Sequence, residues 1–296
     1  MITKMKILFI IWLILIQFFS YGQMSSARKL LLSQESSWDI EKIIEFDSWD
    51  ISEIDNTPQD IAFNPDGTKM YILGSTNDAV YEYSLSTPWN PGTKVNTYTY
   101  TISPSEAVPQ GLFFKPDGTK MYVVGSSSDA VKEYNLGTAW VLSTVSYVQT
   151  FSISFQTLFP TGIFFKPDGT KMYISGSDTD PSGHYVYEYN LSTAWNISST
   201  SYLQRFDVAS LIENISDVFF KPDGTKAYIP GYFLNDKIVE VNLVTAWNVS
   251  TISFAGNKDL TNIGTSGIYI RNDGDMLFLV MYVGGGTGLI YKYTFG

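Results

Sequence analysis

Two aspartates could form a carboxylate pair. Asp60 and Asp217 each follow a polar residue and stand directly before an apolar segment, in the first and fourth of five similar stretches of the 296-residue chain. Two carboxyl groups that face each other across an opening are the arrangement that glycoside hydrolysis needs. The alternative is that both side chains hydrogen-bond the ends of strands, and this is the role that we expect. We therefore assign no catalytic residue and keep Asp60 and Asp217 as the pair to test.

Five polar residues precede the same apolar segments and could bind a ligand. Amide and hydroxyl groups gathered at one opening can hydrogen-bond a neutral polar ligand such as a glycan, or they can cap strand ends and hold water. The set consists of Gln59, Gln110, Thr161, Ser216 and Ser266. We add His184, the only histidine of the chain, because it lies in a long loop between two predicted strands.

The segment DTDPSG, from Asp178 to Gly183, resembles the front of a calcium-binding loop. It lacks the later bidentate acid that completes such a loop, and a polar turn built on Pro and Gly is the alternative. Asp178 and Asp180 are therefore candidate calcium ligands, and we expect no other cofactor. The chain has no Cys, which excludes disulfides, thiol catalysis and Cys-ligated zinc.

The first residues predict a secretory signal peptide at 1–22. Lys4 and Lys6 precede an apolar run from Ile7 to Phe19, which is followed by small residues around a cleavage site. A run of this length is short for a membrane span, although an uncleaved anchor is the alternative. Cleavage would leave a linker at 23–37 and no membrane span. We expect the protein to be secreted, periplasmic or attached to the cell surface.

The remaining chain is acidic. Removing Lys4 and Lys6 from the 19 basic residues leaves 17 against 29 acidic residues, a net charge of −12. An acidic surface repels phosphate backbones, so nucleic acid is excluded as a partner. The expected partner is a glycan or a protein.

A short phrase, PDG or NDG, recurs at a nearly constant period. Its aspartates are Asp66, Asp117, Asp168, Asp223 and Asp273, with spacings of 51, 51, 55 and 50 residues. Pro, Asp and Gly in this order favour a tight turn, and the apolar residues on both sides predict the two strands of a hairpin. Each period therefore predicts the same antiparallel β unit.

The repeats predict a closed ring. Units near 58–103, 109–154, 160–209 and 215–256 each predict four strands, whereas 265–296 supplies only three. Trp38 lies 51 residues before Trp89, in phase with the later tryptophans, so residues 38–52 supply the missing strand. We predict an all-β fold over 38–296, a five-bladed β-propeller of four-stranded antiparallel blades whose last blade is closed by the N-terminal strand.

The segment FFKPDGTKMYVVG, which begins at Phe113, resembles the repeats of secreted bacterial propellers of the YVTN and TolB-like type. Those repeats carry a PDG hairpin followed by a Tyr-Val pair, and the resemblance covers all five units from about Thr57. It implies a propeller without implying an activity, because that superfamily includes enzymes, binding proteins and scaffolds. Relatives of this kind have six to eight blades, so five blades is a departure.

The two faces of the predicted propeller differ. One, the turn face, carries the PDG turns and the tryptophan segments, which we expect to pack between blades. The other, the variable face, carries the loops that differ between units and ten acids against Lys237 and Lys258, so we expect it to be negative. The acids of this face are Glu53, Asp55, Asp78, Glu106, Asp129, Asp178, Asp180, Glu213, Asp236 and Asp259.

Divergent loops on a repeating scaffold favour a binding or interaction module that uses the variable face. Two alternatives remain. The first is a glycan-active enzyme that uses the axial carboxylates, and the second is a structural component of the cell surface or of an adhesin.

Overall fold

The computed structural model describes residues 38–102, 106–178, 183–232, 236–260, 264–283 and 285–296. The predicted signal peptide, the predicted linker and Asp180 lie outside these residues. Within the described part of the chain, no helix is long and apolar enough to cross a membrane.

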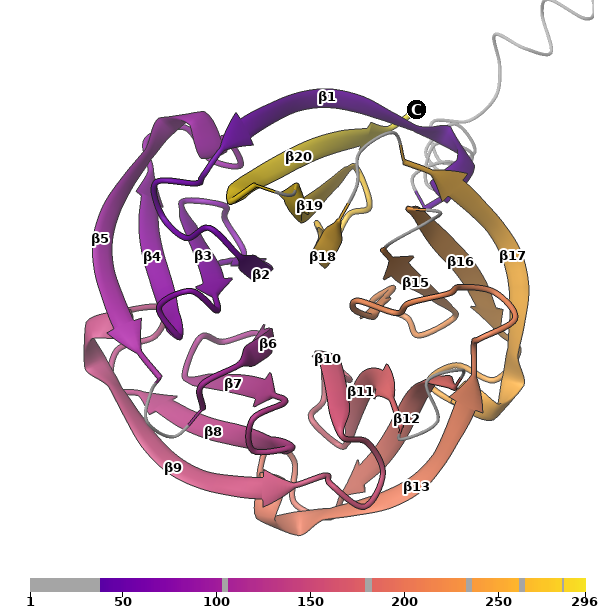
Figure 1. The fold of residues 1–296 in the computed structure, drawn as a ribbon. Helices are drawn as coiled ribbons and strands as arrows, with labels where there is room; N and C mark the ends of the chain where they lie inside the picture. The colour runs from indigo at the N-terminus through magenta and orange to yellow at the C-terminus, as the bar shows by residue number, and fades with distance from the viewer. Residues whose placement is uncertain (1–37, 103–105, 179–182, 233–235, 261–263, 284) are drawn as a thin grey trace, which may run out of the picture.

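Five antiparallel sheets of four strands surround a central axis (Figure 1). The first blade consists of β2 (Pro58–Phe63), β3 (Lys69–Gly74), β4 (Ala79–Leu85) and β5 (Lys94–Thr101), and the second of β6 (Pro109–Phe114), β7 (Lys120–Gly125), β8 (Ala130–Leu136) and β9 (Val145–Ser152). The third consists of β10 (Phe159–Phe165), β11 (Lys171–Ser177), β12 (His184–Leu191) and β13 (Thr200–Asp207), and the fourth of β14 (Phe219–Phe220), β15 (Lys226–Gly231), β16 (Lys237–Leu243) and β17 (Ile252–Asp259). Single 3-10 turns precede the outer strands: η1 (Ile40–Lys42), η2 (Pro91–Thr93), η3 (Leu142–Thr144), η4 (Ile197–Ser199) and η5 (Val249–Thr251).

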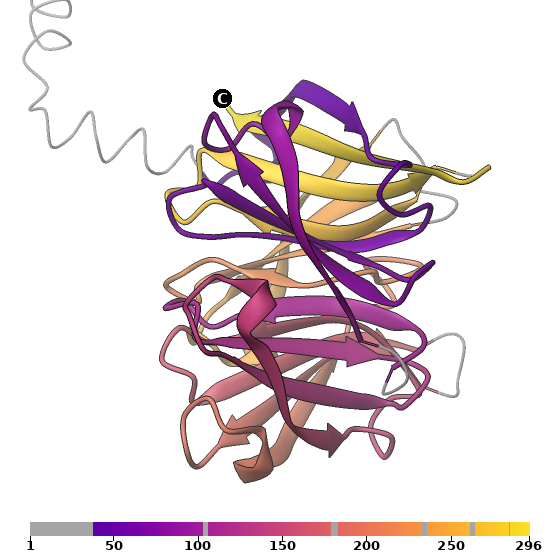
Figure 2. The ribbon, with the colours of Figure 1, turned by 90° about the vertical axis from the view of Figure 1, so that its left-hand side faces the viewer.

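The last blade takes strands from both ends of the described chain. It consists of β18 (Thr265–Ile270), β19 (Met276–Val283), β20 (Thr287–Phe295) and β1 (Ile43–Asp50). β1 pairs with β20 from Ile43 opposite Phe295 to Asp50 opposite Leu289. From the side, β1 lies along the C-terminal strands (Figure 2). The prediction of five blades closed by the N-terminal strand is confirmed.

The PDG turns fix the hairpins and also seat the tryptophans. In the second blade, Gly118 has φ of +73°, and the carboxylate of Asp117 accepts the N–H of Thr119 at 3.0 Å. A Cβ on Gly118 would lie 2.2 Å from Cδ1 of Trp140. Glycine is therefore required twice, by the backbone conformation and by the indole ring that packs on it.

The tryptophans pack between blades, as the repeat predicts. Trp195 of the third blade contacts Phe165 in its own blade, with ring centroids 5.5 Å apart. The hydroxyl of Tyr122, from the second blade, donates to the main-chain oxygen of Trp195 at 2.7 Å. The same tyrosine-to-tryptophan bond joins Tyr71 to Trp140, Tyr173 to Trp247 and Tyr228 to Trp38.

A buried glutamate strengthens the same junctions. Glu133 on β8 pairs with Lys120 and accepts hydrogen bonds from the N–H of Ile197 in the next blade, at 3.1 Å, and from Nε2 of Gln149, at 2.8 Å. Glu82, Glu188 and Glu240 likewise each pair with a lysine and accept a main-chain N–H from the following blade. Four junctions thus share one polar link.

The fifth junction, between the last blade and the first, is built differently. Met276 stands where the other blades have the lysine, and Lys292 stands where they have the glutamate. Pro91 occupies the position whose N–H would need an acceptor, and it has no N–H to offer. Phe278 packs on Phe63 there, with ring centroids 4.6 Å apart. This junction is therefore held by apolar contacts.

Candidate functional site

A β-bulge at the start of four innermost strands positions four of the predicted polar residues. The register of β2 with β3 shifts between Pro58 and Asp60, which leaves Gln59 as the extra residue. The same shift occurs at Gln110, Thr161 and Ser266. In the fourth blade, the N–H of Ser216 bonds to the carbonyl of Pro230 at 3.0 Å, beside an isolated bridge. Bulges turn side chains out of the sheet alternation, here toward the axis.

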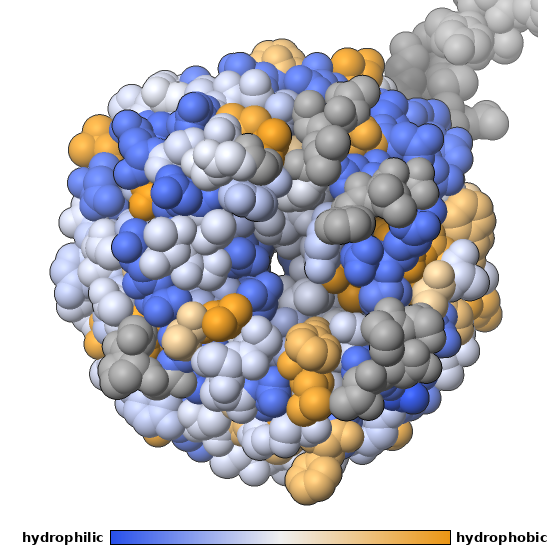
Figure 3. Space-filling model, in the orientation of Figure 1, coloured by the Kyte–Doolittle hydropathy of each residue, from blue (hydrophilic) through white to orange (hydrophobic). Residues whose placement is uncertain are grey.

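All five predicted polar residues line one cavity of about 270 Å³ at the axis. The cavity, which we call the mouth, opens on the variable face, and Figure 3 shows the opening at the centre of that face. Thr57, Tyr232, Gly264, Thr265 and Tyr282 complete its lining. No lining residue among those described carries a formal charge. The sequence placed the five residues together, and their ligand-binding role stays a prediction.

The mouth retains unused hydrogen-bonding capacity. Nε2 of Gln59 donates to the Ser75 hydroxyl at 2.9 Å, and the hydroxyl of Ser216 donates to the carbonyl of Pro230 at 3.1 Å. These bonds hold the side chains in place and leave the Gln59 amide oxygen and the Ser216 lone pairs as acceptors. The Thr265 hydroxyl is buried and has no partner among the described residues. A polar ligand could form a hydrogen bond with this hydroxyl.

Sequence reasoning missed the two tyrosines of the mouth. Tyr232 and Tyr282 stand at the ends of the second strands of neighbouring blades, and each is a little over one third exposed. The equivalent positions in the first three blades carry Ser75, Ser126 and Ser177. A change from serine to tyrosine in two adjacent repeats was the available signal. Both tyrosines line the mouth and come from neighbouring blades.

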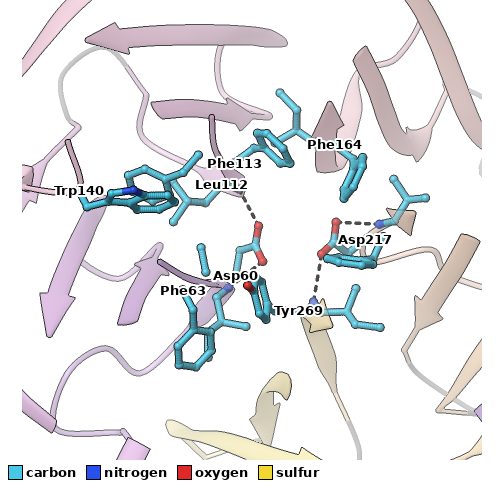
Figure 4. Close-up of a pocket in the computed structure, with 15 residues that line it drawn as sticks. Asp60, Phe63, Leu112, Phe113, Trp140, Phe164, Asp217 and Tyr269 are labelled. Atoms are coloured by element: carbon cyan, nitrogen blue, oxygen red, sulfur yellow. Dashed lines mark hydrogen bonds between the residues drawn. The ribbon is translucent and has the colours of Figure 1, made fainter. Parts of the chain in front are cut away.

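Asp60 and Asp217 lie deeper on the axis and face one narrow cavity of about 70 Å³ from opposite sides (Figure 4). Asp60 accepts the N–H of Ile61 at 2.7 Å and, across the blade junction, that of Leu112 at 2.6 Å. Asp217 accepts the N–H of Val218 at 2.7 Å and that of Ile268 in the next blade at 3.0 Å. Each carboxylate oxygen thus binds a main-chain N–H, an arrangement that links innermost strands.

Burial controls the charge of this pair. Removal from water raises the pKa of both carboxyl groups, and the nearby Asp217 charge raises the pKa of Asp60 further. The main-chain N–H bonds oppose this rise without cancelling it. The other three blades have glycine at the same position, and a Cβ on Gly162 would lie 2.0 Å from Oδ1 of Asp217. Space for two carboxylates exists because their neighbours are glycines.

His184 lies away from the mouth. It is the first residue of β12, is buried, and takes the position that Asp78, Asp129 and Asp236 hold in other blades. Its carbonyl accepts the N–H of Val208 at 2.8 Å, the bond that fixes the start of the outer strand pair. Burial lowers the pKa of its imidazole. The sequence singled out His184 by its rarity; it does not line the mouth, and its ligand-binding role stays a prediction.

The candidate calcium ligand Asp178 forms an ion pair with Arg205 at 2.9 Å. The guanidinium of Arg205 also lies 3.8 Å from the ring centre of Tyr185. Within the described ranges, no group of three or more His, Asp or Glu side chains could hold a metal ion. Calcium binding stays a prediction, because Asp180 lies outside those ranges.

Three acids of the variable face are buried. Asp55 accepts the N–H of Thr57 at 2.9 Å and that of Thr76 at 3.2 Å, and Glu106 lies 3.7 Å from the buried ammonium of Lys132. Asp236 is also buried and accepts the N–H of Gly264 at 2.8 Å. These carboxylates organise loops. They contribute less to the surface charge than the sequence suggests.

No family model and no curated protein matches the sequence. Among solved structures, a luciferin-regenerating enzyme is similar with a TM-score of 0.50 and 10% identity, over 84% of this chain and 95% of that one. A Bacteroides uniformis protein provisionally named as a 6-phosphogluconolactonase has a TM-score of 0.48 and 16% identity, over 75% of this chain and 64% of that one. A Lactobacillus plantarum protein has a TM-score of 0.49 and 12% identity, over 76% and 64%.

This chain therefore spans less than two thirds of the length of the last two structures. At such low identity, the likeness concerns the fold alone. The class that the strands and their order define is a five-bladed β-propeller.

Proposed function

We propose that this protein is a binding module that holds a neutral polar ligand, a glycan, in the mouth. The observation that carries the proposal is the convergence of five polar residues, one from each blade, on a single cavity without charged residues among its described lining. Amides and hydroxyls offer donors and acceptors together, which matches the hydroxyl groups of a sugar. A charged ligand would find no counter-charge in this lining.

Tyr232 and Tyr282 support a sugar over other neutral ligands. A pyranose presents apolar C–H groups on one face and hydroxyls at its edge, so it suits a site with aromatic rings on one side and polar groups below. The two tyrosines supply the rings, and Gln59, Gln110 and Thr161 supply polar groups. A secreted, periplasmic or cell-surface location, predicted from residues 1–22, fits a module that meets extracellular glycans.

The geometry favours binding over hydrolysis. A glycosidase needs carboxyl groups that are free to reach the substrate. Asp60 and Asp217 are instead buried below the mouth, each oxygen accepts an N–H, and the cavity between them has only about 70 Å³. A protein partner on the variable face and a structural role at the cell surface or in an adhesin are the remaining alternatives.

The test is a glycan-array screen of residues 23–296, with and without calcium, followed by calorimetry on the best binder. Tyr282→Ala and Gln110→Ala should each weaken binding about tenfold or more, since each removes a contact in the mouth. Lys166→Ala on the turn face is the matched control and should bind as the wild type does. Binding that survives both mouth variants, or that Lys166→Ala abolishes, would contradict the proposal.

A further inference from the structure

The turn-face end of the axis carries an incomplete ring of aromatic side chains. Four blades contribute one residue each from the innermost strand: Phe113, Phe164, Phe219 and Tyr269. Their ring centroids follow one another at 5.3, 5.2 and 6.0 Å, and each pair meets edge to face. The first blade has Ala62 at the same position, opposite Tyr71 in the register. We call the four residues the axial aromatics, and the gap in their ring lies at Ala62.

The gap also leaves one tryptophan without its usual partner. In three blades the axial aromatic stacks on the tryptophan of the following blade. These pairs are Phe113 with Trp195, Phe164 with Trp247, and Tyr269 with Trp89, at 6.1–6.4 Å and interplanar angles of 18–25°. Trp140 belongs to the second blade, which follows the first blade in the ring. Ala62 of the first blade therefore stands where the stacking partner of Trp140 would be. Trp140 accordingly lines the axial cavity together with Ala62.

The cavity at the gap shares lining residues with a larger cavity. The narrow cavity beside Ala62, of about 70 Å³, shares Phe63, Phe113, Trp140 and Tyr269, among others, with a cavity of about 280 Å³. The prolines of four PDG turns line the outer part of that larger cavity. Neither cavity shares a lining residue with the mouth on the opposite face.

The inner end of this space is acidic. Asp60 and Asp217 are the only Asp, Glu, Lys, Arg or His residues that line either cavity, among the residues described, and both face the axis (Figure 4). Their carboxyl oxygens each use one lone pair on a main-chain N–H, which leaves further acceptor capacity toward the axis. A ligand seated at the gap would therefore have aromatic walls around its ring and carboxyl oxygens beyond it.

We propose that the turn-face cavity binds a small planar aromatic amine. Its ring takes the fifth place beside Ala62, stacks on Trp140 and meets Phe113 and Tyr269 edge to face. Its amine points along the axis toward Asp60 and Asp217 and donates hydrogen bonds to them. Aromatic pairs favour stacked and edge-to-face geometries, and carboxyl oxygens accept hydrogen bonds from an ammonium group, so both ends of the site select this ligand.

Calorimetry on residues 23–296 tests the proposal with three probes of one ring system: tryptamine, indole and indole-3-acetate. Tryptamine should bind at least fivefold more tightly than indole, because it adds the amine. Indole-3-acetate should bind most weakly, because it brings a carboxylate to the acidic end. Equal affinities for the three probes would overturn the assignment of the amine, and no tryptamine binding up to millimolar concentration would overturn the site.

Ala62→Phe places the chain's own ring in the gap and should lower tryptamine affinity at least tenfold while the melting temperature stays equal or rises. Should Ala62→Phe fail to fold, Ala62→Leu fills the gap with a smaller side chain and should lower the affinity in the same direction. Tyr282→Ala in the mouth is the matched control and should leave tryptamine affinity unchanged. Wild-type affinity in a folded Ala62 variant, or loss of binding in Tyr282→Ala, refutes the proposal.

Discussion

Replacing Glu133 by methionine should destabilise the protein by about 3–5 kcal/mol, the typical cost of breaking a buried ion pair on one side. The change leaves the Lys120 ammonium without its counterion and removes the acceptor of the Ile197 N–H, which lies at 3.1 Å. It also removes the acceptor of the Gln149 amide. Because whole domains are stable by only about 5–15 kcal/mol, this loss should be large in a urea titration.

Variants of Lys120, alone and combined with the Glu133 variant, show whether the Glu133–Lys120 ion pair acts as a unit. Lys120→Met should cost a similar amount, because it leaves a buried carboxylate unpaired. The double variant should cost clearly less than the sum, by about 2 kcal/mol or more, because neither charge is then left alone. The Ile197 N–H and the Gln149 amide both lose Glu133 as acceptor in the double variant. The amide keeps its bond to Asn196 at 2.8 Å, so the remaining cost is about 1–3 kcal/mol for the Ile197 N–H.

A surface ion pair provides the control. Lys166 and Asp168 lie 2.7 Å apart in a PDG turn, and the aspartate side chain is half exposed. Lys166→Met should therefore cost less than about 1 kcal/mol. The reasoning fails if Glu133→Met costs no more than this control, or if the Glu133 and Lys120 variants add without coupling.

Three further predictions concern closure, packing and pH. Deleting residues 1–50 removes β1, so the shortened chain should aggregate or melt at a much lower temperature; a soluble product with an unchanged midpoint would contradict five-blade closure. Trp195→Ala should cost about 3–5 kcal/mol in urea unfolding, because the indole is wedged between blades, and a cost under 1 kcal/mol would place the ring outside the core. The raised pKa of Asp217 means that the folded protein holds a proton that the unfolded chain releases, so this group favours folding at low pH and loses that effect as pH rises from about 4 to about 7. Urea titrations at pH 4.5 and 8 give the free energy of unfolding at each pH. This free energy should fall less between the two pH values for Asp217→Asn than for the wild type, and an equal fall would exclude a raised pKa of Asp217.

The architecture was predictable because the sequence repeats the same β unit. Period, turn residues and the phase of Trp38 together specify the number of blades and the closing strand, and each of these signals is local in the sequence. The position of the bulge residues Gln59 and Gln110 was also predictable, since they precede the same apolar strand in each unit. What period alone did not reveal was the bulge that turns these side chains toward the axis.

The missed features depend on contacts between units. Glu133 looks like an ordinary polar residue in a strand, because its partner N–H belongs to Ile197, in the next blade. A signal did exist within the chain. The lysine and the glutamate change together in the last unit, to Met276 and Lys292, and Pro91 of the neighbouring first blade has no N–H to offer. The gap at Ala62 was missed for the same reason. A single small residue in an apolar strand looks unremarkable until five strands meet on one axis.

The pairing of β1 with β20 also sets the order in which the molecule can be completed. The N–H of Gly288 bonds to the hydroxyl of Ser52 across 236 positions of sequence. At about 5–20 residues per second, a ribosome needs roughly 10–50 s to make the chain between them. Throughout that interval β1 lacks its sheet neighbour β20, and the ring cannot close until β20 is made. A chain that stops before Thr287 loses two strands at once, because β20 is the only sheet neighbour of β1 in the described structure.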